Sequence, residues 1–329
     1  MITKIEKITE ESLLKSVELL KSGEVIGIPT ETVYGLGAVG TMPSAVKKIF
    51  EVKGRPADNP LIAHVHKDYD LNKLVYIEHD YVYELLKAYT PGPLTLVFKS
   101  KKVVCEEATC GGETLAVRIP SHKGCQSLLK LLDMPLVAPS ANLSKHTSPV
   151  TAQHVYNDLD GKIPLILDGG KCSGGIESTV LDVTEKVPRI LRAGLITKEM
   201  VEKVVGACLI AEHKEGDKVK SPGVKYKHYQ PKCQTALFSR EQIEEIKKEY
   251  KKYKEQNKIP FIMCDSDMAK NFEGYNLLNL GETEEEIARN LYEKLLEGEK
   301  IADIIIAVEM PNEKGIYLGI TNRLKKSCG

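Results

Sequence analysis

The sequence has no tryptophan, no CxxC pair, no long apolar run and no net charge. No apolar run approaches the roughly 18 residues that a membrane-spanning helix needs, so none is predicted. The 46 basic and 46 acidic residues cancel, so no overall field would attract a nucleic acid. These absences argue against a membrane protein and against a broadly basic nucleic-acid-binding protein.

The eight cysteines are scattered and match neither a zinc pattern nor a disulfide framework. In a chain of 329 residues we expect reduced, mostly buried thiols, as in a cytoplasmic protein. The N-terminal stretch MITKIEKITEE lacks the apolar core of a secretory signal, which also favours the cytoplasm.

The pattern along the chain predicts two domains and a linker. Residues 1–206 alternate short apolar runs, helical patterns and polar loops, which is typical of an α/β domain with a large, mixed, twisted sheet. Residues 207–231 lack apolar periodicity and resemble a spacer, although a run of lysine, tyrosine and histidine there suits an anionic, planar partner. Residues 232–329 predict a small Rossmann-like α/β domain without a dinucleotide fingerprint.

The most unusual stretch is KGRPADNPL at residues 53–61. Gly54 and Pro56 break regular structure around Arg55, and Pro60 disfavours helix at Asn59. We expect an ordered basic loop between a helix over 43–52 and a buried strand over 61–65. A rigid basic loop of this kind indicates an anion site, although a solvated turn has a similar composition.

Other polar loops flank predicted core strands, at residues 30–37, 139–144 and 173–179. Ligands of α/β sheets bind at such strand ends. Arg118 interrupts an apolar strand over 114–119, so it must be ion-paired or contact a ligand. Arg192 ends another short strand. Fixed cations beside hydroxyl-rich loops indicate an α/β enzyme that handles phosphates.

Several longer motifs resemble the YrdC-like family. In order, they are PTETVYGLGA at 29–38, KGRPADNPLIAHV at 53–65, TPGPLT at 90–95, LAVRIP at 115–120, APSANLSKHTSPVTA at 138–152 and IESTVLD at 176–182. The segment SPGVKYKHYQP at 221–231 and the trailing domain resemble the long form of this family, the threonylcarbamoyl-AMP synthases. Val224 is a mild departure, because the long form often has methionine there.

The resemblance implies a nucleotidyltransferase. In its reaction, L-threonine, bicarbonate (or CO₂) and ATP give threonylcarbamoyl-AMP, pyrophosphate and water, for threonylcarbamoyladenosine formation next to the anticodon of certain tRNAs. Mg²⁺ would accompany ATP, with few protein ligands and no dedicated metal site. Downstream tRNA threonylcarbamoyl-transfer proteins would take the product, and neither a membrane nor strong direct tRNA binding is expected.

The resemblance also implies residue roles. L-threonine would contact Thr32, His64, Arg118, the backbone of Ala138, and Ser178. ATP would contact Lys53, Arg55, Asn59, Thr114, Ser140, Ser148 and Arg192, with Lys53 and Arg55 as the catalytic cations. A linker tyrosine would close over ATP: Tyr226 or Tyr229, of which the latter is favoured because it lies between His228 and the rigid Pro231. A structural core histidine is the alternative for His64, and ordinary capping and strand hydroxyls are the alternative for Ser148 and Thr114.

Two other functions remain open. An RNA-binding module would bind tRNA with a steep salt dependence and no need for ATP. A carbamoyl-transfer domain of the hydrogenase-maturation type would be accompanied by acylphosphatase and zinc-finger segments, which this sequence lacks.

Overall fold

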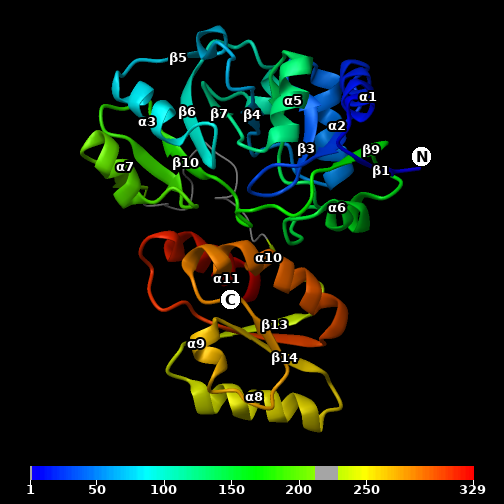
Figure 1. Ribbon diagram of the computed structural model, residues 1–329, viewed down its shortest axis with the longest axis vertical. Coiled ribbons are helices and arrows are strands. Elements are labelled where there is room, and N and C mark those ends of the chain that lie inside the picture. The colour runs from blue at the N-terminus through cyan, green and yellow to red at the C-terminus, as the bar shows by residue number, and fades with distance from the viewer. Residues whose placement is uncertain (1, 212–228) are drawn as a thin grey trace.

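The computed structural model describes residues 2–211 and 229–329, which form two α/β units (Figure 1). The larger unit comprises the residues up to 211 and the smaller one begins at residue 229. Most of the expected linker, including Tyr226, lies outside the described residues.

The larger unit is built on a mixed sheet of twelve strands. The strands are β1 (Lys4–Lys7), β2 (Ile26–Ile28), β3 (Gly35–Val39), β4 (Ile62–His64), β5 (Val75–Tyr76), β6 (Leu94–Ser100), β7 (Thr114–Arg118), β8 (Leu136–Val137), β9 (Leu165–Asp168), β10 (Thr179–Asp182), β11 (Arg189–Arg192) and β12 (Leu209–Ile210). Their order is β1-β9-β2-β3-β8-β4-β7-β6-β10-β11-β12, with β5 paired to β6.

Helices pack around this sheet (Figure 1). They are α1 (Glu10–Lys21), α2 (Pro43–Lys53), α3 (Tyr81–Tyr89), α4 (Glu106–Thr109), α5 (Lys123–Leu132), α6 (Ala152–Leu159) and α7 (Lys198–Val205), with a 3₁₀ turn η1 at Leu71–Lys73. Helix α2 ends at Gly54, whose φ of 58° lets the chain reverse directly into the basic loop. The side chain of Lys53 is therefore fixed in the last turn of a packed helix.

The central strands bring site residues together through their register. Strands β4 and β7 are parallel, and His64 pairs with Arg118. Strand β8 lies antiparallel to β4 on its other side, where His64 is level with Leu136. Because β4 and β7 end at the same edge of the sheet, a histidine and an arginine from distant sequence segments lie side by side.

The smaller unit has four parallel strands in the order β13-β16-β14-β15. The strands are β13 (Gln234–Phe238), β14 (Pro260–Cys264), β15 (Leu277–Asn279) and β16 (Ile304–Val308), and the helices are α8 (Ile243–Glu255), α9 (Ser266–Ala269), α10 (Glu284–Ile301) and α11 (Ile316–Cys328). Helices α10 and α11 lie on the side that faces the larger unit, and α8 lies at the far side (Figure 1).

Both units have the α/β fold that the sequence predicts, and the structure differs from the expected elements in several places. Strand β1 was not expected; it pairs in parallel with β9, far along the chain. The expected loop over 30–37 is a loop only in its first part, because β3 begins at Gly35 and pairs with β2. The pairing of β12 with β11 extends the large sheet to Ile210, beyond the expected boundary at residue 206. Among the described residues, no helix is long and apolar enough to cross a bilayer.

Candidate active site

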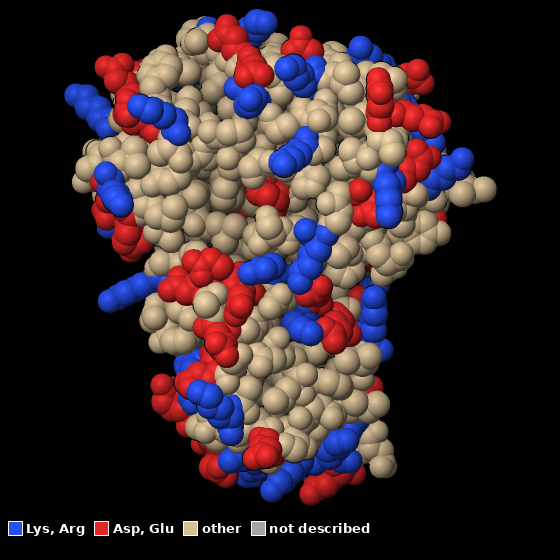
Figure 2. Space-filling view, viewed as in Figure 1, with Lys and Arg blue, Asp and Glu red and all other residues tan. Residues whose placement is uncertain are grey.

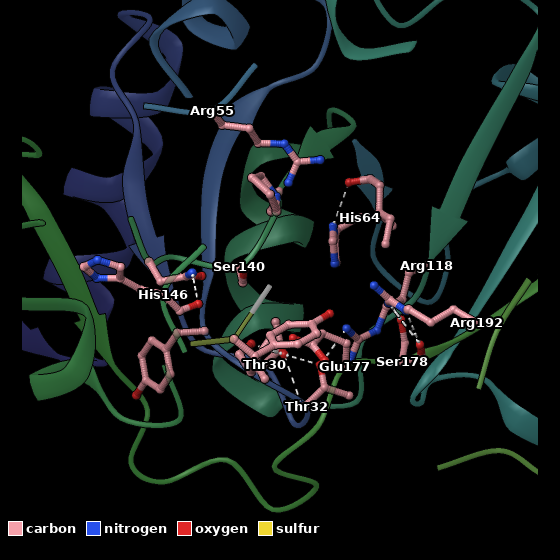
Figure 3. A pocket seen from close by; sticks show the side chains of 18 residues that line it. Thr30, Thr32, Arg55, His64, Arg118, Ser140, His146, Glu177, Ser178 and Arg192 are labelled. Atoms are coloured by element: carbon pink, nitrogen blue, oxygen red, sulfur yellow. Dashed lines mark hydrogen bonds between the residues drawn. The ribbon is translucent and has the colours of Figure 1, made fainter. Parts of the chain in front are cut away.

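One cavity lies where the polar loops of the larger unit meet the start of the smaller unit (Figure 3). Its lining residues are Thr30, Thr32, Val33, Tyr34, Gly35, Arg55, Ile62, His64, Arg118, Ala138, Pro139, Ser140, Asn142, His146, Glu177, Ser178, Arg192 and Tyr229. The cavity volume is about 70 Å³. Typical ligand sites have volumes of roughly 300–1,000 Å³, so this cavity must widen to admit a nucleotide.

Most of the predicted site residues lie around this cavity. They are Thr32, Arg55, His64, Arg118, Ala138, Ser140, Ser178, Arg192 and Tyr229. Lys53, Asn59, Thr114 and Ser148 are absent from its lining.

Lys53 is buried beneath the loop that follows β8. Its ammonium donates hydrogen bonds to the backbone carbonyls of Ser140 and Asn142. Burial, together with the nearby Arg55, lowers the pKa of Lys53 well below its usual value. In this structure Lys53 supports the loop that carries Ser140. A direct contact of Lys53 with ATP stays a prediction.

Arg55 and Asn59 have unsatisfied polar atoms. One guanidinium nitrogen of Arg55 donates to the Asn59 carbonyl at 3.1 Å. Among the described residues, Nε of Arg55 and both side-chain heteroatoms of Asn59 are buried without a hydrogen-bond partner. Buried polar groups are normally paired, so this loop has free hydrogen-bonding capacity for a ligand.

Thr114 and Ser148 lie outside the cavity for different reasons. Thr114 begins β7, where it pairs with Lys99 of β6. Ser148 is completely buried and donates to Oε1 of Glu177 at 2.6 Å. Contacts of Thr114 and of Ser148 with ATP both stay predictions, and in this structure the Ser148 hydroxyl is bound to a carboxylate of the protein itself.

Arg118 is ion-paired in the structure. Its guanidinium lies 2.8 Å from Oε1 of Glu31 and donates to the hydroxyl of Thr32 at 2.7 Å. Burial raises the pKa of Glu31, but the charge of the adjacent Arg118 outweighs that effect and holds the pKa below its usual value. The cation inside an apolar strand thus has a carboxylate partner and still borders the cavity.

His64 is neutral in this site. Its Nδ1 lies 3.0 Å from the carbonyl of Ile62, so this nitrogen carries the proton and donates. Burial, followed by the charge of Arg118, lowers the pKa of His64 to about 3. Because the imidazole is uncharged, the positive charge at this end of the cavity comes from Arg118 and Arg192 (Figure 3).

Ser178 and Arg192 are held together at the start of β10. Arg192 donates to the carbonyl of Ser178 from Nε at 3.2 Å and from Nη2 at 3.0 Å, and to its hydroxyl at 3.2 Å. The Ser178 hydroxyl also lies 2.8 Å from that of Thr95. Both residues are buried and both border the cavity.

Sequence reasoning missed Glu31, Glu177 and His146 as site residues. Each lies inside a motif already singled out, but its role depends on partners far along the chain. Glu177, for example, is paired with Arg323 of the smaller unit. His146 borders the cavity and lies 3.3 Å from a carboxylate oxygen of Asp158. Only the folded arrangement identifies these contacts.

Comparisons with known protein families cover nearly the whole chain. A family described as "Telomere recombination" matches residues 18–194. A family described as "Threonylcarbamoyl-AMP synthase, C-terminal domain" matches residues 196–329. The first match lies within the larger unit, and the second covers the smaller unit together with α7 and β12 of the larger one.

Relatives and solved structures match over both units. The threonylcarbamoyl-AMP synthase of Pyrococcus abyssi is 40% identical over 98% of this chain and 96% of its own length. That of Bacillus subtilis is 38% identical over 97% of this chain and 94% of its own length. The crystal structure of P. abyssi Sua5 complexed with L-threonine superposes with a TM-score of 0.89 at 39% identity, covering 99% of this chain and 96% of that one. The chain belongs to the threonylcarbamoyl-AMP synthase family, in its long form with a second domain.

Proposed function

We propose that this chain joins L-threonine, bicarbonate (or CO₂) and ATP into threonylcarbamoyl-AMP, releasing pyrophosphate and water, as a nucleotidyltransferase of tRNA modification. The observation that carries the proposal is one cavity that joins two clusters. Arg118, His64, Thr32 and Ser178 form one, and Arg55, Ser140 and Arg192 form the other. An amino acid fits the first cluster and a polyphosphate the second.

The first cluster would bind threonine through its carboxylate and hydroxyl. Arg118 offers a guanidinium, the group best suited to a carboxylate. Its present partner Glu31 shares the charge, so the bound carboxylate would lie beside an ion pair rather than a free cation. His64 is neutral, so it adds no further positive charge to this cluster. The P. abyssi relative, whose solved structure contains L-threonine, supports this choice of amino acid.

The second cluster would bind ATP. Arg55 and Arg192 supply fixed positive charge, and Ser140 supplies a hydroxyl on the loop held by Lys53. Asn59 and Thr114 stay proposals for this end, supported by the unpaired polar atoms of Asn59. Tyr229 borders the cavity and is buried, so it would close over the nucleotide.

The reaction depends on positioning of the substrates and on exclusion of water more than on a protein nucleophile. The threonine amine adds to CO₂ to give a carbamate, or to bicarbonate with loss of water. The carbamate oxygen then attacks the α-phosphorus of ATP, and pyrophosphate leaves. Fixed cations stabilise the charge that develops on the phosphates, and a closed cavity protects both labile species from hydrolysis.

The metal would enter with the nucleotide as MgATP. Among the described residues, no group of three or more histidine, cysteine, aspartate or glutamate side chains could hold a metal ion. We propose that the ATP phosphates and water supply most of its ligands, as is usual for Mg²⁺ in phosphoryl transfer. We also propose a cytoplasmic location, because all eight cysteines are free thiols. The product would be passed to downstream tRNA threonylcarbamoyl-transfer proteins.

The two alternative functions, an RNA-binding module and a carbamoyl-transfer domain of the hydrogenase-maturation type, are disfavoured. The match of the whole chain to synthases favours an enzyme over an RNA-binding module or a hydrogenase-maturation domain. On the face shown in Figure 2, acidic and basic side chains are interspersed over both units, which is unlike a surface built for RNA.

The proposal is tested by pyrophosphate release from MgATP with each substrate left out in turn. We expect release that requires both L-threonine and bicarbonate. Release that proceeds equally without threonine, or no release under any condition, would overturn the proposal. Salt-sensitive tRNA binding without any turnover would instead support the RNA-binding alternative.

A further inference from the structure

Glu177 is a buried carboxylate at the boundary between the two units. Its Oε1 accepts from the hydroxyl of Ser148, and its Oε2 accepts from Tyr292 at 2.9 Å and from Nε of Arg323 at 3.1 Å. Ser148 belongs to the larger unit, whereas the other two partners belong to α10 and α11 of the smaller one. Burial raises the pKa of Glu177, but Arg323, Arg192 and Ser148 outweigh that effect and keep it below its usual value.

Arg323 donates hydrogen bonds to several groups of the larger unit. It is fully buried in α11. Besides Glu177 Oε2, its guanidinium donates to the backbone carbonyls of Ala193 and Glu177, the latter at 3.5 Å. These carbonyls adjoin Arg192 and Ser178 in the chain. Arg323 of the second unit thus donates hydrogen bonds to both backbone segments that carry the paired residues Arg192 and Ser178.

The backbones of the two units approach closely around this arginine. A Cβ added to Gly175 would lie 2.3 Å from Cα of Arg289 in α10. A Cβ added to Gly319 of α11 would lie 3.3 Å from Cα of Gly194. The two glycines remove the side chains that would keep α10 and α11 away from the loops before β10 and after β11, so Arg323 and Tyr292 reach Glu177.

We propose that Arg323 and Tyr292 of the second unit are positioning residues of the active site, which fix Ser178 and Arg192 by holding Glu177 and the adjacent backbone. The inference rests on the proposed function in assigning Ser178 and Arg192 to substrate. It gives the second unit a role in the site although α10 and α11 do not line the cavity: their side chains hold Glu177, which does.

A merely structural ion pair would have different consequences. Loss of Arg323 would then lower the amount of folded protein but leave each folded molecule with its normal threonine affinity. If instead Arg323 positions Ser178, the KM for L-threonine must rise. The KM does not depend on the concentration of active enzyme, so it separates the two roles.

The experiment uses the full-length chain with Arg323→Met, Glu177→Gln, the double variant and Lys325→Met. Lys325 is the matched control, because it is a cation on the same helix whose side chain is half exposed and paired with Glu313. Threonine-dependent pyrophosphate release gives the KM and kcat. We expect Arg323→Met to raise the KM for L-threonine by about tenfold or more and Lys325→Met to change it less than about twofold.

The double variant tests the pairing. Because Glu177→Gln removes the charge that Arg323→Met leaves unpaired, we expect the double variant to be impaired far less than the product of the two single effects. An unchanged KM in Arg323→Met, or strictly multiplicative effects, would overturn the inference. Should Arg323→Met fail to fold, Tyr292→Phe removes a single hydroxyl; we expect a KM about threefold higher at an unchanged melting temperature, and an unchanged KM would overturn the inference.

A second readout separates this inference from the proposed function. Hydrogen–deuterium exchange of the parent, Arg323→Met and Lys325→Met proteins requires no substrate. We expect faster exchange in Arg323→Met around residues 177–179 and 193–194, and no change there in Lys325→Met. If the parent shows no threonine-dependent turnover, the proposed function fails, and unchanged exchange in Arg323→Met would overturn the positioning claim separately.

Discussion

Arg118 and Glu31 form a buried ion pair 2.8 Å apart at the edge of the cavity. The arginine also donates to Thr32, so its orientation is fixed before any substrate arrives. Its charge is already partly neutralised, and a threonine carboxylate would bind it in competition with Glu31 or beside it. The structural and substrate-binding roles of Arg118 are therefore separable by experiment.

Arg118→Met should be strongly destabilising, because it leaves Glu31 buried without its cation. Breaking a buried pair in this way costs about 3–5 kcal/mol. The double variant Arg118→Met/Glu31→Gln should regain most of that stability and still show a KM for L-threonine raised about tenfold or more. Thermal unfolding and steady-state kinetics give the two answers. Full recovery of threonine affinity in the double variant would exclude Arg118 from carboxylate binding.

Lys53 and Arg55 lie two residues apart in the motif but should respond differently to substitution. Lys53→Met removes two charge-assisted hydrogen bonds to the Ser140 loop, so we expect it to lower the free energy of unfolding by about 3 kcal/mol. Arg55→Ala removes a half-buried side chain whose Nε is unpaired, so we expect little loss of stability and a KM for ATP raised about tenfold. The comparison needs denaturation and kinetics on both variants. An unfolded Arg55→Ala protein would mean that the loop is structural.

His64 makes stability depend on pH. Its folded pKa of about 3 lies below the usual value of 6.5, so the unfolded chain binds a proton that the folded chain does not. The parent should lose stability as the pH falls from about 6.5 towards 3, by about 1.4 kcal/mol per pH unit from this residue. His64→Gln should lack that component. Parallel melting curves from pH 7 to pH 4.5 test it, and curves of equal slope for the two proteins would contradict it.

Gly175 should tolerate no side chain. It has φ of 78°, and an added Cβ would meet the backbone of Arg289. Gly206 has φ of 84° and open space around it. Gly206→Ala is therefore the control that introduces backbone strain without a steric clash. We expect Gly206→Ala to cost about 1–2 kcal/mol, and Gly175→Ala to cost clearly more and to reduce turnover. Calorimetry and the pyrophosphate assay measure both, and equal effects would mean that the two units are not in close contact there.

The main elements could be predicted because their signals are local. Helix α1 shows the Thr9 cap and its acidic first turn in the sequence, and the cap is present in the structure. Helix α5 over Lys123–Leu132 and the buried strand β16 likewise follow from apolar patterns. Strand β1 had no such signal, since three of its four residues are exposed and its partner β9 lies far along the chain.

The same difference between local signals and long-range partners applies to the site residues. Arg118 stands out because a cation in an apolar strand is anomalous, and Arg192 because it ends a short strand; both border the cavity. The direction in which a side chain points was not predictable: Lys53 turns to backbone carbonyls and Ser148 to a carboxylate. Glu177 was missed because its partner Arg323 lies in the other unit, and nothing local marks such a pair.

The most direct test of the central claim is product analysis with ¹³C-labelled bicarbonate. The full-length protein is incubated with MgATP, L-threonine and the label, quenched rapidly and examined by mass spectrometry. We predict threonylcarbamoyl-AMP carrying one ¹³C atom, formed in step with pyrophosphate. An unlabelled threonine–AMP adduct, or pyrophosphate release without any labelled product, would contradict the account.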